Sequence, residues 1–429
     1  MLDRVDVRGL DEGVLRALLA RPEAGGESVR DAVTAILARV RAEGDAALVE
    51  LTERFDGCHL DSLEVEPGAA EAALDRLDPD LRLALELARD QILAWHAAQH
   101  DREAHHVRMG VRVRELVVPV GRAGCYVPGG RAAYPSTVLM TVVPARVAGV
   151  PEVALCVPPG PDGSIPDPVL AAAALAGADE IYRVGGAQAI GALAFGTDSI
   201  APVDVVVGPG NAYVAEAKRQ VAGVVGIDSL AGPSEIAIVA DRLAPADLVA
   251  ADLLAQAEHG PGGAAVVITW DPQVAEAVDE AVERLLRATA RHDEAAATLA
   301  SGGRVVLVDD PQHAMAAVNA IAPEHVQLMV EDAELLVPSV RDAGAVFVGN
   351  DAPAVLGDYI AGVNHVLPTG GTARFASALG VQHFQKRVHV VDVEPGALER
   401  LAPYVELLAE TEGLHAHAEA VRRRIGGRP

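Results

Sequence analysis

Residues 124–158 read GCYVPGGRAAYPSTVLMTVVPARVAGVPEVALCVP and decide the fold. They place the end of a strand, a Pro-Gly-Gly turn, a helix-length segment and a second short apolar run in direct succession. A run that is apolar on both faces is typical of a strand buried inside a parallel sheet. A strand, a crossover helix and a parallel strand make the βαβ unit of α/β proteins. The stretch therefore predicts a parallel sheet covered by helices.

Similar apolar runs recur along the chain and alternate with Ala-rich segments of helix length. These candidate strands are residues 114–120, 152–158, 180–186, 203–209, 235–241, 264–270, 304–310, 325–330 and 344–349. At least eight strands favour two sheets over one. The first hundred residues have helical periodicity, and the chain is expected to return to helix after Lys386. We predict an α/β protein without internal repeats.

Composition narrows the class of protein. The 429 residues carry a net charge of −26 at pH 7, whereas a nucleic-acid-binding protein needs the opposite sign. The three cysteines lie far apart, which excludes Cys-x-x-Cys motifs and fits a reducing compartment. The amino terminus lacks the apolar core of a signal peptide, and no apolar stretch is long enough to span a bilayer. We expect a cytoplasmic protein that binds neither nucleic acid nor membrane.

Three glycine-rich turns follow predicted strands and form the first candidate site. They lie at residues 127–130, 184–188 and 207–211. Because the carboxyl ends of parallel strands meet at one edge of a sheet, these turns are expected to cluster where open α/β folds bind nucleotides. The side chains of Gln188 and Asn211 can hydrogen-bond a ribose or an amide. The alternative is that the turns only join strand to helix, since no G-x-G-x-x-G motif and no phosphate loop occur.

A candidate metal site lies at the end of an amphipathic helix within residues 251–263. Gln256 and His259 are three residues apart, so they share one helix face and can place an oxygen and a nitrogen on one metal ion. The alternative is that His259 only caps the helix. Asp358 supplies a carboxylate suited to a hard metal ion. The rival histidine pairs are assigned to solvated helix surface or loop, and they are His96 with His100 and His105 with His106.

Glu324 and His325 stand together just before a predicted strand. A carboxylate and an imidazole make a general-base pair, because one can activate water while the other moves a substrate proton. Neighbouring side chains on a strand point in opposite directions, so both facing one site requires irregular backbone there. The alternative is an ordinary surface pair. The glycine-rich stretch 357–387 adds His365 as a substrate contact, and the last segment adds Glu412, His415 and His417.

Taken together, the distinctive strings of the chain resemble histidinol dehydrogenase. The match runs in order from about residue 25 to the carboxyl terminus. The strings are GCYVPGGRAAYPSTVLMTVVPARVAGV, VGGAQAIGALAFGT, VGPGNAYVAEAKRQV, AGPSEIAIVAD, DLLAQAEHGP, APEH, GDYIAGVNHVLPTGGTARFASALGVQHFQKR and EGLHAHAEAV.

The resemblance implies an enzyme that oxidises L-histidinol to L-histidine through L-histidinal, in two successive NAD-dependent hydride transfers that end histidine biosynthesis. It implies one Zn²⁺ per subunit, held by Gln256, His259, Asp358 and His417. The implied NAD contacts are Tyr126, Gln188 and Asn211. The implied substrate contacts are Ser234, Gln256, His259, His325, Asp358, His365, Glu412 and His417, with Glu324 and His325 as the catalytic residues.

The resemblance also implies two incomplete Rossmann-like domains with parallel-sheet cores and small helical pieces at both ends. The expected boundaries are 1–23 for the amino-terminal helical piece, 24–125 with 235–377 for the first, split domain, 126–234 for the second, NAD-binding domain, and 378–429 for a carboxyl-terminal helical dimerisation piece. Homodimers of the family share active sites. His365, Glu412 and His417 are therefore expected to serve the zinc site of the neighbouring subunit.

The implied mechanism assigns the alcohol proton to His325 and the activation of water to Glu324. Cys125 is a rival nucleophile for the aldehyde, but a small buried residue is favoured there, because no His or Lys lies nearby in sequence to lower the pKa of its thiol. Two other functions remain as alternatives: a zinc hydrolase that uses Glu324, and a non-catalytic protein that binds an imidazole ligand.

Overall fold

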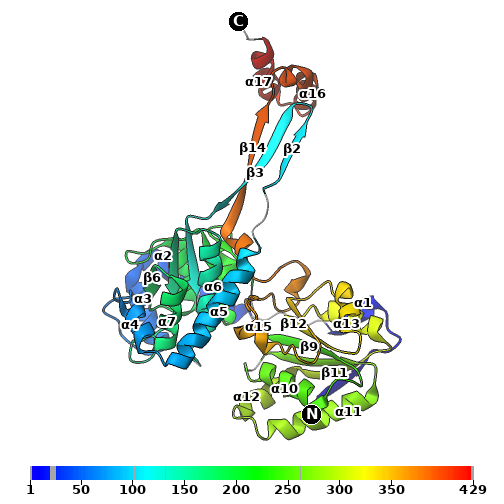
Figure 1. The fold of residues 1–429 in the computed structure, drawn as a ribbon. Helices are drawn as coiled ribbons and strands as arrows, with labels where there is room; N and C mark the ends of the chain where they lie inside the picture. Colours follow the sequence, from blue (N-terminus) through cyan, green and yellow to red (C-terminus); the bar gives the residue numbers. More distant parts are fainter. Residues whose placement is uncertain are drawn as a thin grey trace. The chain divides into compact units, whose positions relative to one another are not determined.

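The computed structural model describes residues 2–19, 26–99, 103–130, 132–230, 232–260 and 262–426. The chain forms two compact units (Figure 1). Unit 1 comprises Met1–Gln99 and Val120–Phe384, and unit 2 comprises His100–Pro119 and Gln385–Pro429. Within the described ranges, none of the helices is both long enough and apolar enough to cross a membrane.

Unit 1 contains a five-stranded parallel sheet with the strand order β6-β5-β4-β7-β8. Its strands are β4 (Arg122–Tyr126), β5 (Glu152–Cys156), β6 (Glu180–Tyr182), β7 (Val205–Val207) and β8 (Gly226–Ile227). One face is covered by α4 (Ala69–Arg76), α5 (Pro79–Ala97), α6 (Pro135–Val147) and α7 (Asp167–Ala176). The other face is covered by α2 (Glu27–Glu43), α3 (Asp45–Asp56), α8 (Gly186–Phe195) and α9 (Ala212–Val221).

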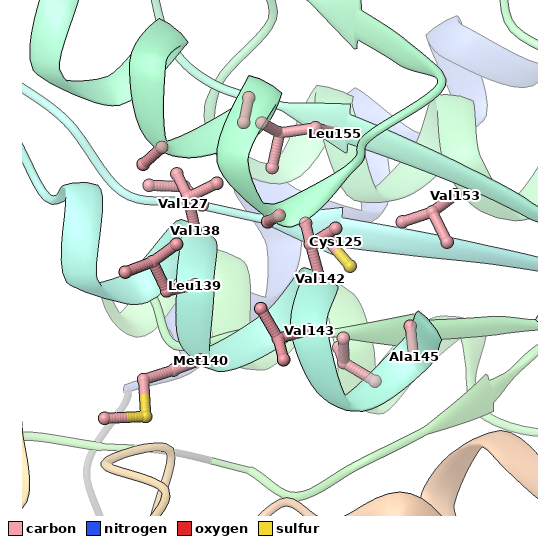
Figure 2. Packing of buried hydrophobic residues seen from close by; sticks show 14 of the residues in the cluster. Cys125, Val127, Val138, Leu139, Met140, Val142, Val143, Ala145, Val153 and Leu155 are labelled. Atoms are coloured by element: carbon pink, nitrogen blue, oxygen red, sulfur yellow. The ribbon is translucent and has the colours of Figure 1, made fainter. Parts of the chain in front are cut away.

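Alternation along the strands builds the two apolar cores of this sheet. Cys125 and Leu155 point to the core under α6 and α7, whereas Tyr126 and Cys156 point to the opposite core. Figure 2 shows the first core, where Val142 of α6 lies beside Cys125 and Val138 lies beside Val127. Because both faces are buried, the strands need to be apolar on both sides, as the sequence pattern predicted.

Unit 1 also contains a six-stranded parallel sheet with the order β1-β11-β10-β9-β12-β13. Its strands are β1 (Asp3–Asp6), β9 (Glu235–Ala240), β10 (Ala264–Thr269), β11 (Gly303–Leu307), β12 (His325–Met329) and β13 (Ala345–Val348). Helices α10 (Ala246–Ala257), α11 (Pro272–Leu286) and α12 (His292–Gly302) cover one face. Helices α1 (Glu12–Leu19), α13 (Pro311–Ile321) and α14 (Ala333–Leu336) cover the other.

The chain between the six-stranded sheet and unit 2 is largely irregular. It contains a short helix, α15 (Val355–Tyr359), and two 3₁₀ helices, η2 (Thr372–Arg374) and η3 (Val381–Phe384), while η1 (Val337–Ser339) follows α14. Buried polar contacts hold this segment in place. Asn364 donates from Nδ2 to the carbonyl of Met140 at 2.7 Å, and its Oδ1 accepts from the N–H of Val366 at 2.9 Å.

Unit 2 is an antiparallel ribbon with a helical end. The ribbon has the order β14-β3-β2 and consists of β2 (His105–Arg108), β3 (Val111–Pro119) and β14 (Gln385–Val393). Helices α16 (Ala397–Thr411) and α17 (His415–Gly426) follow β14 and pack on each other (Figure 1). The prediction of a parallel strand at 114–120 was therefore wrong about its pairing, because an apolar run does not reveal the direction of its partner.

Other expectations also need correction. The chain returns to helix after Lys386 as predicted, but only from Ala397, because Gln385–Val393 form β14, whose four valines favour extended structure. The amino-terminal piece, expected to be helical, begins with β1 at the edge of the six-stranded sheet. Helices α2 to α5 pack on the five-stranded sheet, whereas residues 24–125 were expected to share a domain with residues 235–377. The two-sheet α/β architecture itself is confirmed.

Candidate active site

The three glycine-rich turns meet at the carboxyl edge of the five-stranded sheet. The buried phenol of Tyr126, at the end of β4, accepts a hydrogen bond from the N–H of Gly186 in the second turn at 3.2 Å. In the third turn, a Cβ on Gly208 would lie 2.1 Å from the carbonyl oxygen of Tyr126. The backbones of the first and third turns are therefore in direct contact. The structure brings the turns together as the strand pattern predicted.

Pro158 packs between the first two turns. A Cβ on Gly129 would lie 2.6 Å from Cγ of Pro158, and one on Gly185 would lie 2.4 Å from its Cβ. Only glycine fits at either position without a shift of this proline. By contrast, a Cβ on Gly130, which has φ +89°, would meet no atom within 4 Å. The second glycine of the Pro-Gly-Gly turn thus borders open space, which leaves room for a ligand.

Strand order marks the same place as the ligand crevice. The chain runs from β4 outward to β5 and β6 and then returns to β7 on the other side of β4. Open α/β sheets bind ligands at such a reversal, outside the carboxyl ends of the strands. Helix α8 starts there without a side-chain cap, and Asn211 caps α9 through Oδ1, which accepts from the N–H of Tyr213 and Val214. The NH₂ group of Asn211 is the end left for a ligand, while Gln188 is buried on α8.

Cys125 takes no part in this crevice. It is fully buried in the core under α6, and burial raises the pKa of its thiol to about 12. A neutral, inaccessible thiol is a poor nucleophile. The interpretation of Cys125 as a small buried residue is confirmed.

The acid–base residues lie at the amino edge of the six-stranded sheet. Oε2 of Glu324 accepts hydrogen bonds from the hydroxyl of Ser234 at 2.5 Å and from the N–H of Glu235 at 2.9 Å. Nδ1 of His325 lies 3.1 Å from the carbonyl oxygen of Glu235 and 3.6 Å from Oε2 of Glu324. Both side chains therefore contact the amino end of the neighbouring strand, β9.

Irregular backbone allows these two neighbours to face one place. Glu324 precedes β12, and the chain reaches it through Ala322, which has φ +53° at the end of α13, and then Pro323. The strand alternation begins only at His325, so the condition set by the sequence pattern is met. Both side chains are buried, with exposed fractions of 7% for Glu324 and 4% for His325. The alternative of an ordinary surface pair is therefore wrong.

Burial determines the acid–base properties of the pair. Burial raises the pKa of Glu324, while the charge of a protonated His325 and the Ser234 hydroxyl act in the opposite direction. A backbone carbonyl can only accept, so Nδ1 of His325 carries the proton in its bond to Glu235. Nε2 is then the basic nitrogen, and it lies 3.8 Å from Oδ1 of Asp358. The geometry provides a base and a carboxyl group side by side.

Asp358 and His365 join this centre from the segment around α15. Nδ1 of His365 lies 3.0 Å from the carbonyl oxygen of Asp358, and its Nε2 lies 3.1 Å from the hydroxyl of Thr137 on α6. Burial lowers the pKa of His365, while the carboxylate of Asp358 opposes this shift. Both ring nitrogens of His365 already have protein partners, so it holds Asp358 and α6 together. Thr137 and Glu235 were missed by the sequence analysis, because their role depends on contacts between distant elements.

Gln256 and His259 lie at the end of α10, near the same centre. Nδ1 of His259 bonds to the carbonyls of Ala255 and Gln256, which leaves Nε2 for a ligand. His259, Asp358 and His325 are all close enough to His365 to influence its pKa. Gln256 is buried, and Nε2 of its carboxamide has no hydrogen-bond partner among the described residues. A metal ion would bind this carboxamide through its oxygen, since the NH₂ group can only donate. The carboxamide oxygen, the Nε2 of His259 and the carboxylate of Asp358 are donor types that fit Zn²⁺.

The expected metal donors include a glutamine, so acidic, histidine and cysteine side chains make up only part of the set. Among the described residues, no three of these side chains form a group that could hold a metal ion. Glu412 and His417 belong to unit 2, at the junction of α16 and α17, and His415 begins α17. The assignment of these residues to a metal or substrate site stays a prediction.

The rival histidine pairs can be placed in part. His96 was expected on solvated surface but is fully buried on α5, where its Nδ1 bonds to the carbonyl of Ile92 and its Nε2 lies 3.4 Å from Nδ2 of Asn364. Periodicity did not reveal this polar contact inside the core. His105 and His106 lie on the exposed strand β2, and His100 lies outside the described residues.

Comparison with known proteins identifies the family. The family model described as histidinol dehydrogenase matches residues 19–425. A histidinol dehydrogenase of Rhizobium meliloti is 47% identical over 412 residues, which cover 95% of each chain. One of Synechococcus is 50% identical over 402 residues, covering 92% of this chain and 91% of that relative. The crystal structure of histidinol dehydrogenase from Elizabethkingia anophelis superposes with a TM-score of 0.94 at 35% identity, covering 99% of this chain and 98% of that one. The chain belongs to the histidinol dehydrogenase family of oxidoreductases.

Proposed function

We propose that the protein oxidises L-histidinol to L-histidine through L-histidinal, by two successive NAD-dependent hydride transfers at a zinc site. Membership of the family supports the reaction. The observation that carries it in this chain is the buried pair of Glu324 and His325, with Nε2 of His325 free to accept a proton. The reaction completes histidine biosynthesis. Three free, buried cysteines fit the reducing cytoplasm in which it is expected.

His325 is the base for the alcohol. Its Nδ1–H bond to the carbonyl of Glu235 fixes the ring and leaves the lone pair of Nε2 available. Nε2 takes the hydroxyl proton of histidinol as the alcohol carbon is oxidised. In the second oxidation the same nitrogen takes the proton from a hydroxyl of the aldehyde hydrate. One positioned imidazole thus serves both steps.

Glu324 is the base for water. Burial raises the pKa of its carboxyl, which strengthens it as a proton acceptor. As a water oxygen bonds to the carbonyl carbon of the aldehyde, Glu324 takes one proton from the water and the carbonyl oxygen gains one, which gives the hydrate. Oε2 of Glu324 lies 3.6 Å from Nδ1 of His325, so both bases face this carbon. The hydroxyl of Ser234 and the N–H of Glu235 hold the carboxylate in this position.

The donors for zinc are Gln256, His259 and Asp358 of one subunit and His417 of the partner subunit. Zinc, when bound, holds the imidazole and amino nitrogens of the substrate and so fixes the alcohol beside the base. The support in this chain is the Nε2 of His259, which is left for a ligand because Nδ1 bonds to the carbonyls of Ala255 and Gln256. Asp358 is held by its own segment, through the bond from His365 to its carbonyl.

The NAD site comprises the three turns at the carboxyl edge of the five-stranded sheet. NAD, when bound, accepts the hydride in each oxidation. The NH₂ group of Asn211 and the open space beside Gly130 suit its phosphates and riboses. Gln188 and Tyr126 are proposed as further contacts. In Tyr126 the phenol is already engaged by Gly186, so its part is to shape the turn.

The proposed reaction is tested by counting NADH. Pure protein with NAD and L-histidinol should form about two NADH for each histidinol consumed, because an alcohol becomes a carboxylate. A chelator should abolish the reaction, and added Zn²⁺ should restore it. One NADH per histidinol with release of aldehyde would contradict the two-step proposal. Histidinol binding without NADH would favour a binding protein, and hydrolysis of an ester or amide without NAD would favour a zinc hydrolase.

Substitution of the two bases should separate the two oxidations. In H325N, kcat should fall by about 10²- to 10⁴-fold with either histidinol or histidinal as substrate, since the base serves both steps. In E324Q, histidinal oxidation should fall by about 10²-fold or more, whereas histidinol oxidation falls less. Single-turnover kinetics with each substrate measures the difference. The exposed Glu334, replaced by Gln, is the matched control. Equal losses in both steps of E324Q would refute its assignment to water.

The proposed sharing of sites between subunits can be tested by mixing two inactive variants. If each site takes Glu324 from one chain and His417 of the partner subunit, a mixed dimer of E324Q and H417A has one intact site. Random assembly of co-expressed chains should then recover about a quarter of the wild-type activity. Purification through two different tags isolates the mixed dimer, and an activity assay checks the result. No recovery in the mixed dimer would show that each site lies within one chain.

A further inference from the structure

Lys218 is an unusual residue for its place in the fold. It is one of only two lysines in the chain, it lies on α9, and its side chain is 2% exposed. Its ammonium forms an ion pair with Asp228, which follows β8 and has a side chain that is 1% exposed. Removing two charges from water costs more than an apolar pair of the same volume would. Stability alone therefore does not explain why the chain buries this ion pair.

Both charges also bind the same glycine. Nζ of Lys218 donates to the carbonyl oxygen of Gly208 at 3.0 Å. Oδ2 of Asp228 accepts from the N–H of Gly208 at 2.8 Å. The donor and the acceptor of one peptide residue are thus held by two opposite charges that also contact each other. Such charge-assisted hydrogen bonds are stronger than those between neutral groups.

Gly208 is the residue at which the third turn touches the first. It follows β7, and its φ of +119° is open only to glycine. A Cβ there would lie 2.1 Å from the carbonyl oxygen of Tyr126, and β7 and β4 flank the reversal of the strand order. Any movement of Gly208 therefore changes the contact between the third turn and the carbonyl of Tyr126. The ion pair therefore sets the distance between the two turns.

The same contacts fix the start of α9. Two residues separate Gly208 from Asn211, and Oδ1 of Asn211 caps α9. Lys218 is the seventh residue of that helix. The hydrogen bond from Nζ of Lys218 to the carbonyl of Gly208 connects the helix back to the turn that precedes Asn211. Loss of that bond frees the turn at one end and the helix start at the other. The NH₂ group of Asn211 would then lose its fixed direction.

We propose that Lys218 and Asp228 are positioning residues for NAD, which hold the Gly208–Asn211 turn against Tyr126 in the geometry that binds the cofactor. The pair does not touch NAD itself. This inference rests on the proposed NAD site at the three turns. It goes beyond the contacts assigned to Tyr126, Gln188 and Asn211, since it explains what holds Asn211 in position relative to Tyr126.

Equilibrium binding of NAD, measured by isothermal titration calorimetry, tests the inference without relying on turnover. The K218M variant should bind NAD between about 10- and 100-fold more weakly, the range typical of a lost outer positioning contact. Its KM for histidinol should stay within about twofold of the wild-type value. The variant K386M, which removes the other, exposed lysine, should bind NAD as the wild type does.

A double variant distinguishes positioning from a purely structural role. K218M/D228L removes both charges and leaves an apolar pair, which is expected to retain a wild-type melting temperature. If the pair positions the turn, this stable protein still binds NAD at least about tenfold more weakly. Wild-type NAD affinity in K218M/D228L would overturn the inference. D228N is the second test, because its amide oxygen can still accept a hydrogen bond from the N–H of Gly208. If D228N and K218M both bind NAD with wild-type affinity, the inference is also overturned.

Failure of the NAD proposal would look different. In that case the wild-type protein itself would show no NAD binding and no NADH formation. Failure of the present inference leaves wild-type binding intact and shows equal affinity in the Lys218 and Asp228 variants. The two results are separated by the wild-type titration, which is run first.

Discussion

The Ser234 hydroxyl and the backbone of Glu235 are the constraint on which the proposed acid–base chemistry depends. They receive Glu324 through an N–H and a hydroxyl, and they receive His325 through a carbonyl. These contacts exist because β9 and β12 are parallel neighbours that begin at the same edge of the six-stranded sheet. A fixed carboxylate and a fixed imidazole tautomer are therefore in place before any ligand binds. Such preorganisation lowers the reorganisation needed during the reaction.

The residues proposed for NAD and those proposed for proton transfer lie at opposite edges of their respective sheets. The turns proposed for NAD lie at the carboxyl edge of the five-stranded sheet, whereas the acid–base pair lies at the amino edge of the six-stranded sheet. A direct contact connects the two regions, since His365 bonds to Thr137 on the helix that follows the first turn and to the carbonyl of Asp358. Two hydrogen bonds through His365 thus connect α6, which follows the first turn, with the backbone of Asp358.

The apolar runs of the sequence predicted the sheets, because buried parallel strands are apolar on both faces. The glycine-rich turns after these runs predicted that the turns cluster, because the carboxyl ends of parallel strands meet at one edge. These patterns did not predict β14, whose valines alternate with charged residues on an exposed ribbon, or the partner of β3. They also left Glu324 and His325 undecided, since the φ of Ala322 that orients them is not encoded by residue type. Contacts between distant elements, such as Lys218 with Gly208, have no local signature.

The central claim is that the bond to the carbonyl of Glu235 fixes the tautomer of His325, with the proton on Nδ1 and Nε2 as the base. ¹⁵N NMR of protein labelled at histidine, with the His325 signals assigned by their loss in H325N, measures this directly. The account predicts that the neutral ring carries its proton on Nδ1 and none on Nε2. A proton on Nε2 with a bare Nδ1 would contradict the hydrogen bond to Glu235 and, with it, the proposed role of His325 in both oxidations.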